Sequence, residues 1–157
     1  MNDIEVIEYD FFDPLHRKKL VELMNEYISD EMGGGELIKG EKILDLINGL
    51  QSHPSKLILF AKINGQIIGL TNCFVNFGTF AAQPIINIHD IIVIQQHRGK
   101  GVGRALMNNI EKRANEIGCA KVTLEVREDN YNAQKLYKSL GFGESEPKML
   151  FWTKTLF

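Results

Sequence analysis

The sequence predicts an α/β (α+β) fold in which a mixed central sheet has helices on both faces. Apolar residues alternate in some segments and recur at helical spacing in others. A strand–helix–strand segment in the second half predicts two parallel strands joined by a right-handed crossover. An Asn64-Gly65 pair between two apolar runs predicts an antiparallel hairpin. Taken along the chain, these signals predict the order β-α-α-β-β-β-α-β-α-β.

The first third of the chain carries a strand and two helices. Residues 2–9 alternate weakly, which predicts a strand. Asp13-Pro14 predicts a helix start, because the Asp side chain can cap free N–H groups and Pro lacks the N–H that this position leaves unpaired. Gly33-Gly34-Gly35 predicts a loop between the helices. Helical spacing is carried by Leu20, Leu23, Met24 and Tyr27 in the first helix, and by Ile43, Leu44, Ile47 and Leu50 in the second.

The rest of the chain predicts strands that alternate with helices. The hairpin joins residues 57–63 and 66–75, and the nearly continuous apolar run 85–94 is typical of a strand buried on both faces. The remaining expected elements are a helix after Gly103 that ends at Gly118, a strand over 120–127, a helix capped by Asn130 that ends at Gly141, and a strand over 148–156.

Composition narrows the class of protein. The chain has 157 residues, of which 44% are hydrophobic and 24% charged, so we expect one domain over residues 1–157. The net charge of −2 disfavours nucleic acid as a partner, and no apolar run is long enough to span a membrane. The acidic N-terminus does not resemble a signal peptide. Cys73 and Cys119 have neither disulfide-framework nor metal-ligand spacing, so we expect a cytoplasmic protein without a metal.

One segment joins the buried strand to the following helix and is rich in glycine and cations: Gln96-His97-Arg98-Gly99-Lys100-Gly101-Val102-Gly103-Arg104. Glycines let backbone N–H groups approach a ligand, and the positive helix end favours an anion such as a pyrophosphate. The spacing is not that of a P-loop. It is also not a dinucleotide fingerprint, since Arg104 stands where that motif needs glycine. A solvated glycine turn is the alternative interpretation.

Two motifs in order resemble the GCN5-related N-acetyltransferase (GNAT) superfamily. Gln96-x-x-Gly99-x-Gly101 is similar to its Q/R-x-x-G-x-G/A signature, and the segment from Asn130 to Phe142 resembles its later motif. The neighbourhood of both most resembles the diamine and polyamine acetyltransferase branch. The resemblance implies that acetyl-CoA is the co-substrate and that acetyl passes directly from the thioester to a primary amine of a small molecule or peptide.

The resemblance also implies cofactor contacts. In the family the glycine turn holds the pyrophosphate, and backbone groups of the preceding strand pair with the pantetheine arm. Tyr137 resembles the general acid, because a phenol with an ordinary pKa of about 10 keeps its proton at pH 7. From periodicity alone Tyr137 would be a core aromatic residue. The implied cofactor-binding residues are Ile91, Ile92, Val93, His97, Arg98, Gly99, Lys100, Gly101, Val102, Gly103, Arg104, Asn130 and Tyr137.

The general base is less well defined by the sequence. Family members often place a Glu on the strand before the glycine turn, and His89 stands at that position with Asp90 beside it. We take both as catalytic candidates and His89 also as a substrate contact. Alternation predicts that they lie on opposite faces, so that only one faces the cleft. Each could instead be a buried, hydrogen-bonded core residue. Glu31, in the loop after the first helix, is a candidate contact for a cationic amine.

Three functions compete at this stage. The first is an acetyl-CoA-dependent N-acetyltransferase, favoured by Tyr137. The second is a non-catalytic acyl-CoA sensor, which the His in place of Glu keeps open. The third is another nucleotide-binding enzyme that would bind ATP or NAD instead of coenzyme A. The family resemblance makes a homodimer a further expectation, and the acceptor amine is not defined by the sequence.

Overall fold

The computed structural model describes residues 3–156, which divide into two compact units after Glu125. The first unit contains β1 (Ile4–Glu8), α1 (Pro14–Ser29), α2 (Glu41–Ser52), β2 (Lys56–Ile63), β3 (Gln66–Gly78), β4 (Gln83–Val93), the short 3-10 helix η1 (Gln95–His97), α3 (Val102–Glu116) and β5 (Lys121–Leu124). The second unit contains α4 (Tyr131–Ser139).

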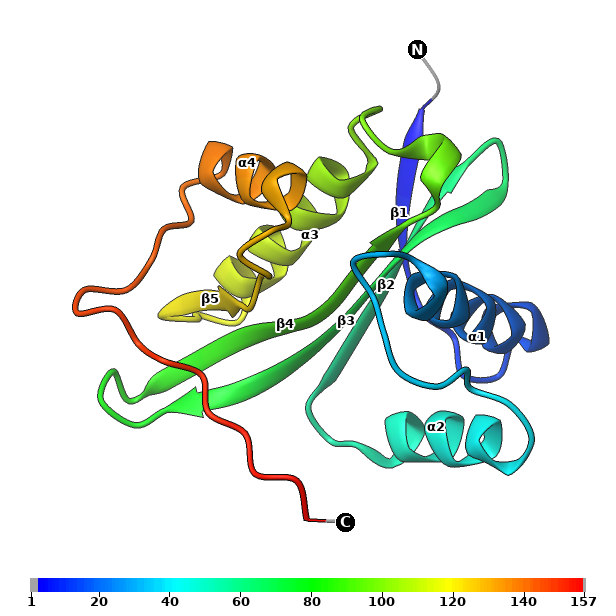
Figure 1. The fold of residues 1–157 in the computed structure, drawn as a ribbon, viewed down its shortest axis with the longest axis horizontal. Helices are drawn as coiled ribbons and strands as arrows, with labels where there is room; N and C mark the ends of the chain where they lie inside the picture. The colour runs from blue at the N-terminus through cyan, green and yellow to red at the C-terminus, as the bar shows by residue number, and fades with distance from the viewer. Residues whose placement is uncertain (1–2, 157) are drawn as a thin grey trace. The chain divides into compact units, whose positions relative to one another are not determined.

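The first unit is built on a five-stranded sheet in the order β1-β2-β3-β4-β5 (Figure 1). Neighbouring strands are antiparallel except β4 and β5, which are parallel and joined through α3. The predicted crossover unit and the mixed sheet are therefore confirmed.

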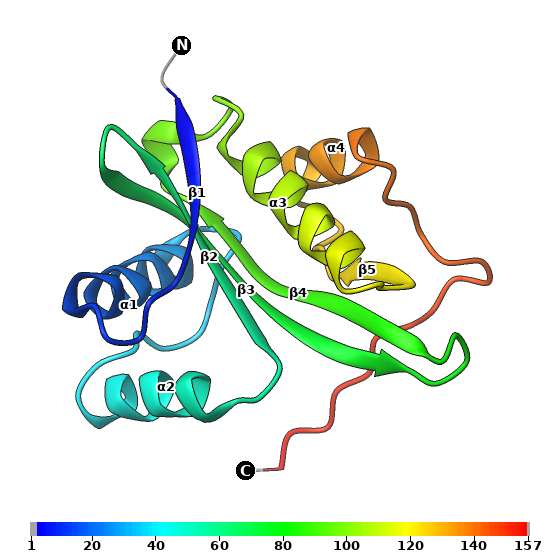
Figure 2. The ribbon, with the colours of Figure 1, turned by 180° about the vertical axis from the view of Figure 1, so that it is seen from behind.

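Helices cover both faces of this sheet, as Figures 1 and 2 show from opposite sides. Phe60 pairs with Leu70, and both belong to a buried cluster with Leu20 and Leu23 of α1. The next pair along, Ala61 and Gly69, faces the other way. A Cβ at Gly69 would lie 3.2 Å from Leu106 of α3. Because side chains alternate along a strand, α1 and α3 pack on opposite faces.

The starts of α1 and α4 and the turn between β2 and β3 lie where the capping and turn residues of the sequence predicted them. The Asp13 carboxylate accepts a hydrogen bond from the Leu15 N–H at 2.8 Å, and Pro14 occupies the first helical turn. Asn64 and Gly65 have φ values of 50° and 80°, as the two-residue hairpin turn requires. In the second unit Asn130 caps α4 by accepting from the Ala133 N–H at 3.2 Å.

One expected strand is shorter than predicted, and another is absent. The strand predicted over 120–127 ends at Leu124, and residues 148–156 form no strand. Within the second unit, the Gln134 amide donates to the carbonyls of Arg127 and Glu128, so these backbone groups serve α4 instead of a ladder. The side chains of residues 148–156 that the structure describes are exposed, and no strand among residues 3–156 pairs with them. Alternation shows that a segment can form a strand, but only a paired strand is stable.

Candidate active site

The β4–α3 turn has the backbone of an anion site. Gly99 and Gly101 have φ values of 73° and 86°, a region that side chains disfavour. Gly101 is the N-cap of α3 and has no side chain, so the first N–H groups of the helix find no side-chain acceptor at the cap position. Lys100 is exposed and has no ion-pair partner among residues 3–156. The turn therefore presents uncapped donors beside a cation, as a pyrophosphate requires.

Arg98 connects this turn to the end of α1. Its guanidinium pairs with the Asp30 carboxylate at 2.8 Å, and its Nε donates to the Val93 carbonyl at 2.9 Å. The Glu26 carboxylate accepts from the Gln95 N–H at 3.4 Å, a second link between the same two regions. The structure thus places Arg98 beside the turn with its guanidinium held by Asp30.

The other residues of the turn differ in how far they are exposed. His97 is half-buried, and its Nδ1 atom has no hydrogen-bond partner within the described chain. Val102 is buried in the core, whereas Arg104 is exposed on the first turn of α3. Gly103 is half-buried between them.

A β-bulge interrupts β4 directly before the turn. Asp90 is opposite Asn72 and Ile88 is opposite Cys73, which leaves His89 as the extra residue. The parallel pairing of β4 with β5 also stops at Ile88. Beyond the bulge, the β5-side edge of residues 89–93 has no paired strand in the first unit. The unpaired edge of β4 therefore leads toward the β4–α3 turn.

The bulge overturns the prediction that His89 and Asp90 lie on opposite faces. Asp90 accepts a hydrogen bond from the Asn72 amide at 3.0 Å, while the His89 ring contacts Phe74 edge-on at 5.6 Å between ring centroids. Asn72 and Phe74 are two residues apart on β3, with regular pairing to β2, so they share a face. His89 and Asp90 therefore lie on the same face, the one that α1 covers.

This face has a polar centre in apolar surroundings. The Asn72 side chain is 3% exposed, and its amide nitrogen also lies 3.3 Å from the Met24 sulfur of α1. Asp90 is half-buried, whereas His89 is exposed. The Phe74 ring contacts both the His53 ring and the His89 ring. The sequence analysis missed Asn72, although an Asn in the apolar run QIIGLTNCFV signals a polar group that needs a partner.

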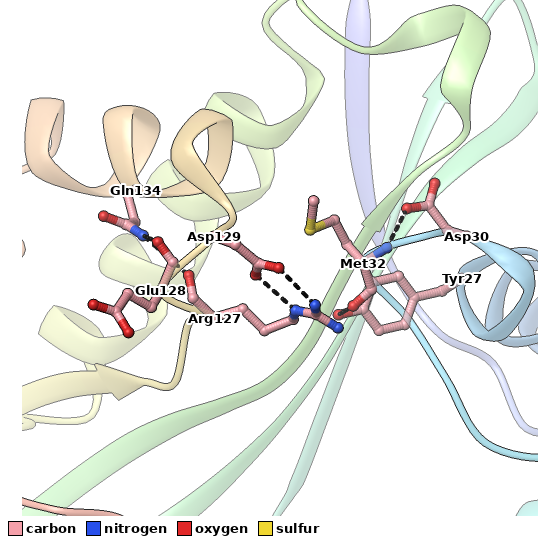
Figure 3. Close-up of polar contacts among 7 residues, drawn as sticks. All are labelled: Tyr27, Asp30, Met32, Arg127, Glu128, Asp129 and Gln134. Carbon is pink, nitrogen blue, oxygen red and sulfur yellow. Dashed lines mark hydrogen bonds and ion pairs between the residues drawn. The ribbon is translucent and has the colours of Figure 1, made fainter.

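The loop between α1 and α2 borders the same region of the first unit and is held in place. The Asn25 side chain donates to the Ile38 carbonyl at 2.9 Å and accepts from the Ile38 N–H at 2.7 Å. The Asp30 carboxylate accepts from the Met32 N–H at 2.9 Å (Figure 3). This hydrogen bond and the Arg98 ion pair hold the pKa of Asp30 below its usual range. Glu31, the expected amine contact, is exposed next to this anchor.

The second unit contains the other predicted site residues. Asn130 follows a turn in which Arg127 forms two hydrogen bonds with Asp129, of 2.8 and 2.7 Å (Figure 3). These bonds lower the pKa of Asp129. Tyr137 is 7% exposed on α4, and its ring lies 6.1 Å from that of Phe142. The burial of Tyr137 fits the apolar periodicity of α4. Asn130 caps that helix by accepting from the Ala133 N–H.

Other candidate chemistry is absent from the described residues. No group of three or more His, Cys, Asp or Glu side chains in residues 3–156 is arranged to hold a metal ion. Burial raises the pKa of the Cys73 thiol to about 12, so it is not a thiolate near neutral pH. No helix in that part of the chain has the length and apolar character needed to cross a membrane.

Comparisons with known proteins show what the chain is similar to. Over 95 residues the chain is 32% identical to the uncharacterized N-acetyltransferase YhfO of Bacillus subtilis, covering 60% of this chain and 63% of that protein. It is 35% identical over 86 residues to an uncharacterized N-acetyltransferase of Methanocaldococcus jannaschii, covering 54% of this chain and 38% of that protein. The chain therefore matches less than two thirds of the length of either curated relative.

Solved structures show the same fold at lower identity. A probable acetyltransferase matches 96% of this chain and 97% of its own with a TM-score of 0.81 and 19% identity. An aminoglycoside N-acetyltransferase, AAC(6')-Iy, in complex with CoA matches 98% of this chain and 96% of its own with a TM-score of 0.76 and 16% identity. A sequence model described as the acetyltransferase (GNAT) family matches residues 20–142. The chain belongs to the acetyltransferase (GNAT) family.

Proposed function

We propose that this protein is an acetyl-CoA-dependent N-acetyltransferase that acts on a primary amine, with both units working as one domain. The observation that carries the proposal is the β4–α3 turn, where two glycines with positive φ lead into a helix without a side-chain cap. Family membership supports it, since the matched residues 20–142 include the turn and extend into both units.

The residues present fit coenzyme A. The N–H groups of Val102 and Gly103 would hold the pyrophosphate, because they lie at the positive end of α3 before the first hydrogen bond of the helix, from Ala105 to Gly101. Arg104, the next residue, is a further proposed contact. The exposed Lys100 adds positive charge. The backbone of Ile91, Ile92 and Val93 lies on the unpaired edge beyond the bulge and would hold the pantetheine arm. When bound, acetyl-CoA supplies an acetyl group activated as a thioester.

The chain must also move two protons. His89 and Asp90 share one face of the sheet, so either side chain can take a proton from an acceptor amine bound at that face. The other side chain then helps to position the amine. His89 is exposed and hence accessible to a substrate. We propose Tyr137 as the acid that protonates the leaving thiolate and Asn130 as a further cofactor contact. The family resemblance of their motif supports both roles.

The acceptor class follows from charge. Glu31 lies exposed at the start of the loop that Asp30 anchors, where it would attract a cationic amine. Polyamines are one such class, and aminoglycosides are another. An aminoglycoside acetyltransferase in complex with sisomicin matches this fold with a TM-score of 0.78 and 15% identity. We further propose that the protein acts in the cytoplasm and forms a homodimer, which sedimentation analysis would check.

Thiol release from acetyl-CoA tests the proposal. The panel contains polyamines, amino acids, aminoglycosides and short peptides, and acetyl-CoA binding is measured in the same samples. We expect release that depends on one class of amine and an acetylated product of matching mass. Acetyl-CoA binding without release from any amine would instead indicate a sensor. Binding of ATP or NAD in preference to acetyl-CoA would overturn the assignment of the turn.

A further inference from the structure

We propose that Asn72 and Asp90 together form the anchoring site for the ammonium group of the acceptor, so that the pair selects cationic over neutral substrates. This inference rests on the proposed amine acetyltransferase function and adds a residue that the reading of the motifs did not include.

The Asn72 amide has an unused acceptor in a buried position. Its nitrogen donates to Asp90 and lies close to the Met24 sulfur, whereas its Oδ1 atom has no partner in the described chain. Exchanging the amide oxygen and nitrogen would place oxygen against the Asp90 carboxylate, and two acceptors would then repel each other. The orientation of the amide is therefore fixed. An unpaired buried acceptor is costly, and a ligand that supplies a donor removes the cost.

Asp90 provides the charge. It is half-buried, and no Lys, Arg or His side chain in residues 3–156 forms an ion pair with it. Its one hydrogen bond in that part of the chain comes from the Asn72 amide. Because the Asn72 amide nitrogen donates to the Asp90 carboxylate, the oxygen of the same amide lies near that carboxylate as a second acceptor. A primary ammonium has three N–H donors, so it can bind both at once and neutralise the carboxylate.

The apolar groups next to Asn72 and Asp90 suit the aliphatic chain of an alkylammonium ligand. The Met24 thioether lies against Asn72, and the Phe74 ring, on the same face of the sheet, contacts the His53 and His89 rings. The Met24 thioether and the Phe74 ring therefore offer apolar and aromatic surface next to Asn72 and Asp90. A neutral alcohol of the same length could satisfy one acceptor, but it would leave the Asp90 charge unpaired.

The experiment follows binding of n-butylammonium by NMR to the full ¹⁵N-labelled chain, at constant ionic strength and without acetyl-CoA. The readouts are the side-chain amide of Asn72 and the backbone amides of His89 and Asp90. We expect these signals to move with n-butylammonium and to stay in place with n-butanol. Movement with both compounds, or with neither, would overturn the proposal.

Variants sharpen the test. Asn72→Leu keeps the branched shape of the side chain and removes both polar atoms, so the dissociation constant for n-butylammonium should rise by about tenfold or more. Thr71→Val is the matched control, because Thr71 is also fully buried but lies on the face that α3 covers. It should bind like the unchanged protein. Should Asn72→Leu fail to fold, Asp90→Asn decides, since it keeps the shape and removes the charge.

Kinetics separate this inference from the proposed function. In Asn72→Leu the KM for the acceptor amine should rise while the dissociation constant of acetyl-CoA stays unchanged, a split that general misfolding would not produce. If the protein binds n-butylammonium as described but releases no thiol with any amine, the proposed function fails and the anchoring site stands. If thiol release is normal and Asn72→Leu keeps the original KM, the anchoring site is wrong and the proposed function stands.

Discussion

Alanine at Gly101 should weaken acetyl-CoA binding far more than an equally strained alanine elsewhere on the same helix. Gly101 has φ +86° at the N-terminus of α3, and Gly118 has φ +71° just beyond its C-terminus. A Cβ at Gly101 would meet Ile4 at 3.8 Å, an ordinary contact, and one at Gly118 would meet nothing within 4 Å. Each substitution therefore costs mainly backbone strain, about 1–2 kcal/mol. That lowers Tm by several degrees in a chain of this size.

The two variants differ in what the strain disturbs. At Gly101, relief of strain turns the N–H groups of Val102 and Gly103 away from a bound pyrophosphate. Losing one charge-assisted hydrogen bond costs about 1.5–3 kcal/mol, or about ten- to a hundredfold in affinity. Calorimetric titration with acetyl-CoA measures the dissociation constant, and thermal unfolding measures the strain. Equal affinities in Gly101→Ala and Gly118→Ala, at similar Tm values, would refute the assignment of this turn.

Three further predictions concern single side chains. Tyr137→Phe should lower kcat while the acetyl-CoA dissociation constant stays unchanged, because the variant loses only the proton-donating hydroxyl; unchanged kcat would remove Tyr137 as the acid. Asp30→Asn removes the ion pair with Arg98 and should cost about 0.5–1 kcal/mol of unfolding free energy in urea at pH 7. The pKa of Asp30 is lowered in the folded state, so this difference should disappear as pH falls below about 4 through that value; a difference that persists at pH 2 would contradict it. Tyr9→Phe should leave stability at pH 7 unchanged or higher, because the buried Tyr9 hydroxyl has no partner in the described residues. Burial raises the pKa of Tyr9 to about 12, so the original protein should lose stability relative to this variant as pH rises from 10 to 12, and parallel unfolding curves over that range would argue against it.

Signals confined to a few neighbouring residues predicted the fold well. Asp13-Pro14, Asn64-Gly65 and Asn130 act through their own side chains or φ angles, and each lies where the structure places the corresponding cap or turn. The crossover from β4 to β5 followed from general topology. These features need no information about distant parts of the chain.

Features that depend on pairing between distant segments were missed. The bulge at His89 is a property of the register between β3 and β4, and nothing in the local alternation of residues 85–94 indicates it. The same limit explains the early end of β5 and the absent strand over 148–156, where suitable residues lack a partner. Asn72 could be assigned to the site only from the pairing of β3 with β4, which places it opposite Asp90.

The central claim, that the β4–α3 turn holds coenzyme A, is tested most directly by NMR titration of the labelled chain with coenzyme A. The account predicts the largest shifts at the backbone amides of Gly99, Gly101, Val102, Gly103 and Arg104, with small shifts at Gly118 on the opposite end of α3. Saturable binding that leaves the amides of residues 99–104 in place would contradict it, as would the absence of binding at millimolar coenzyme A.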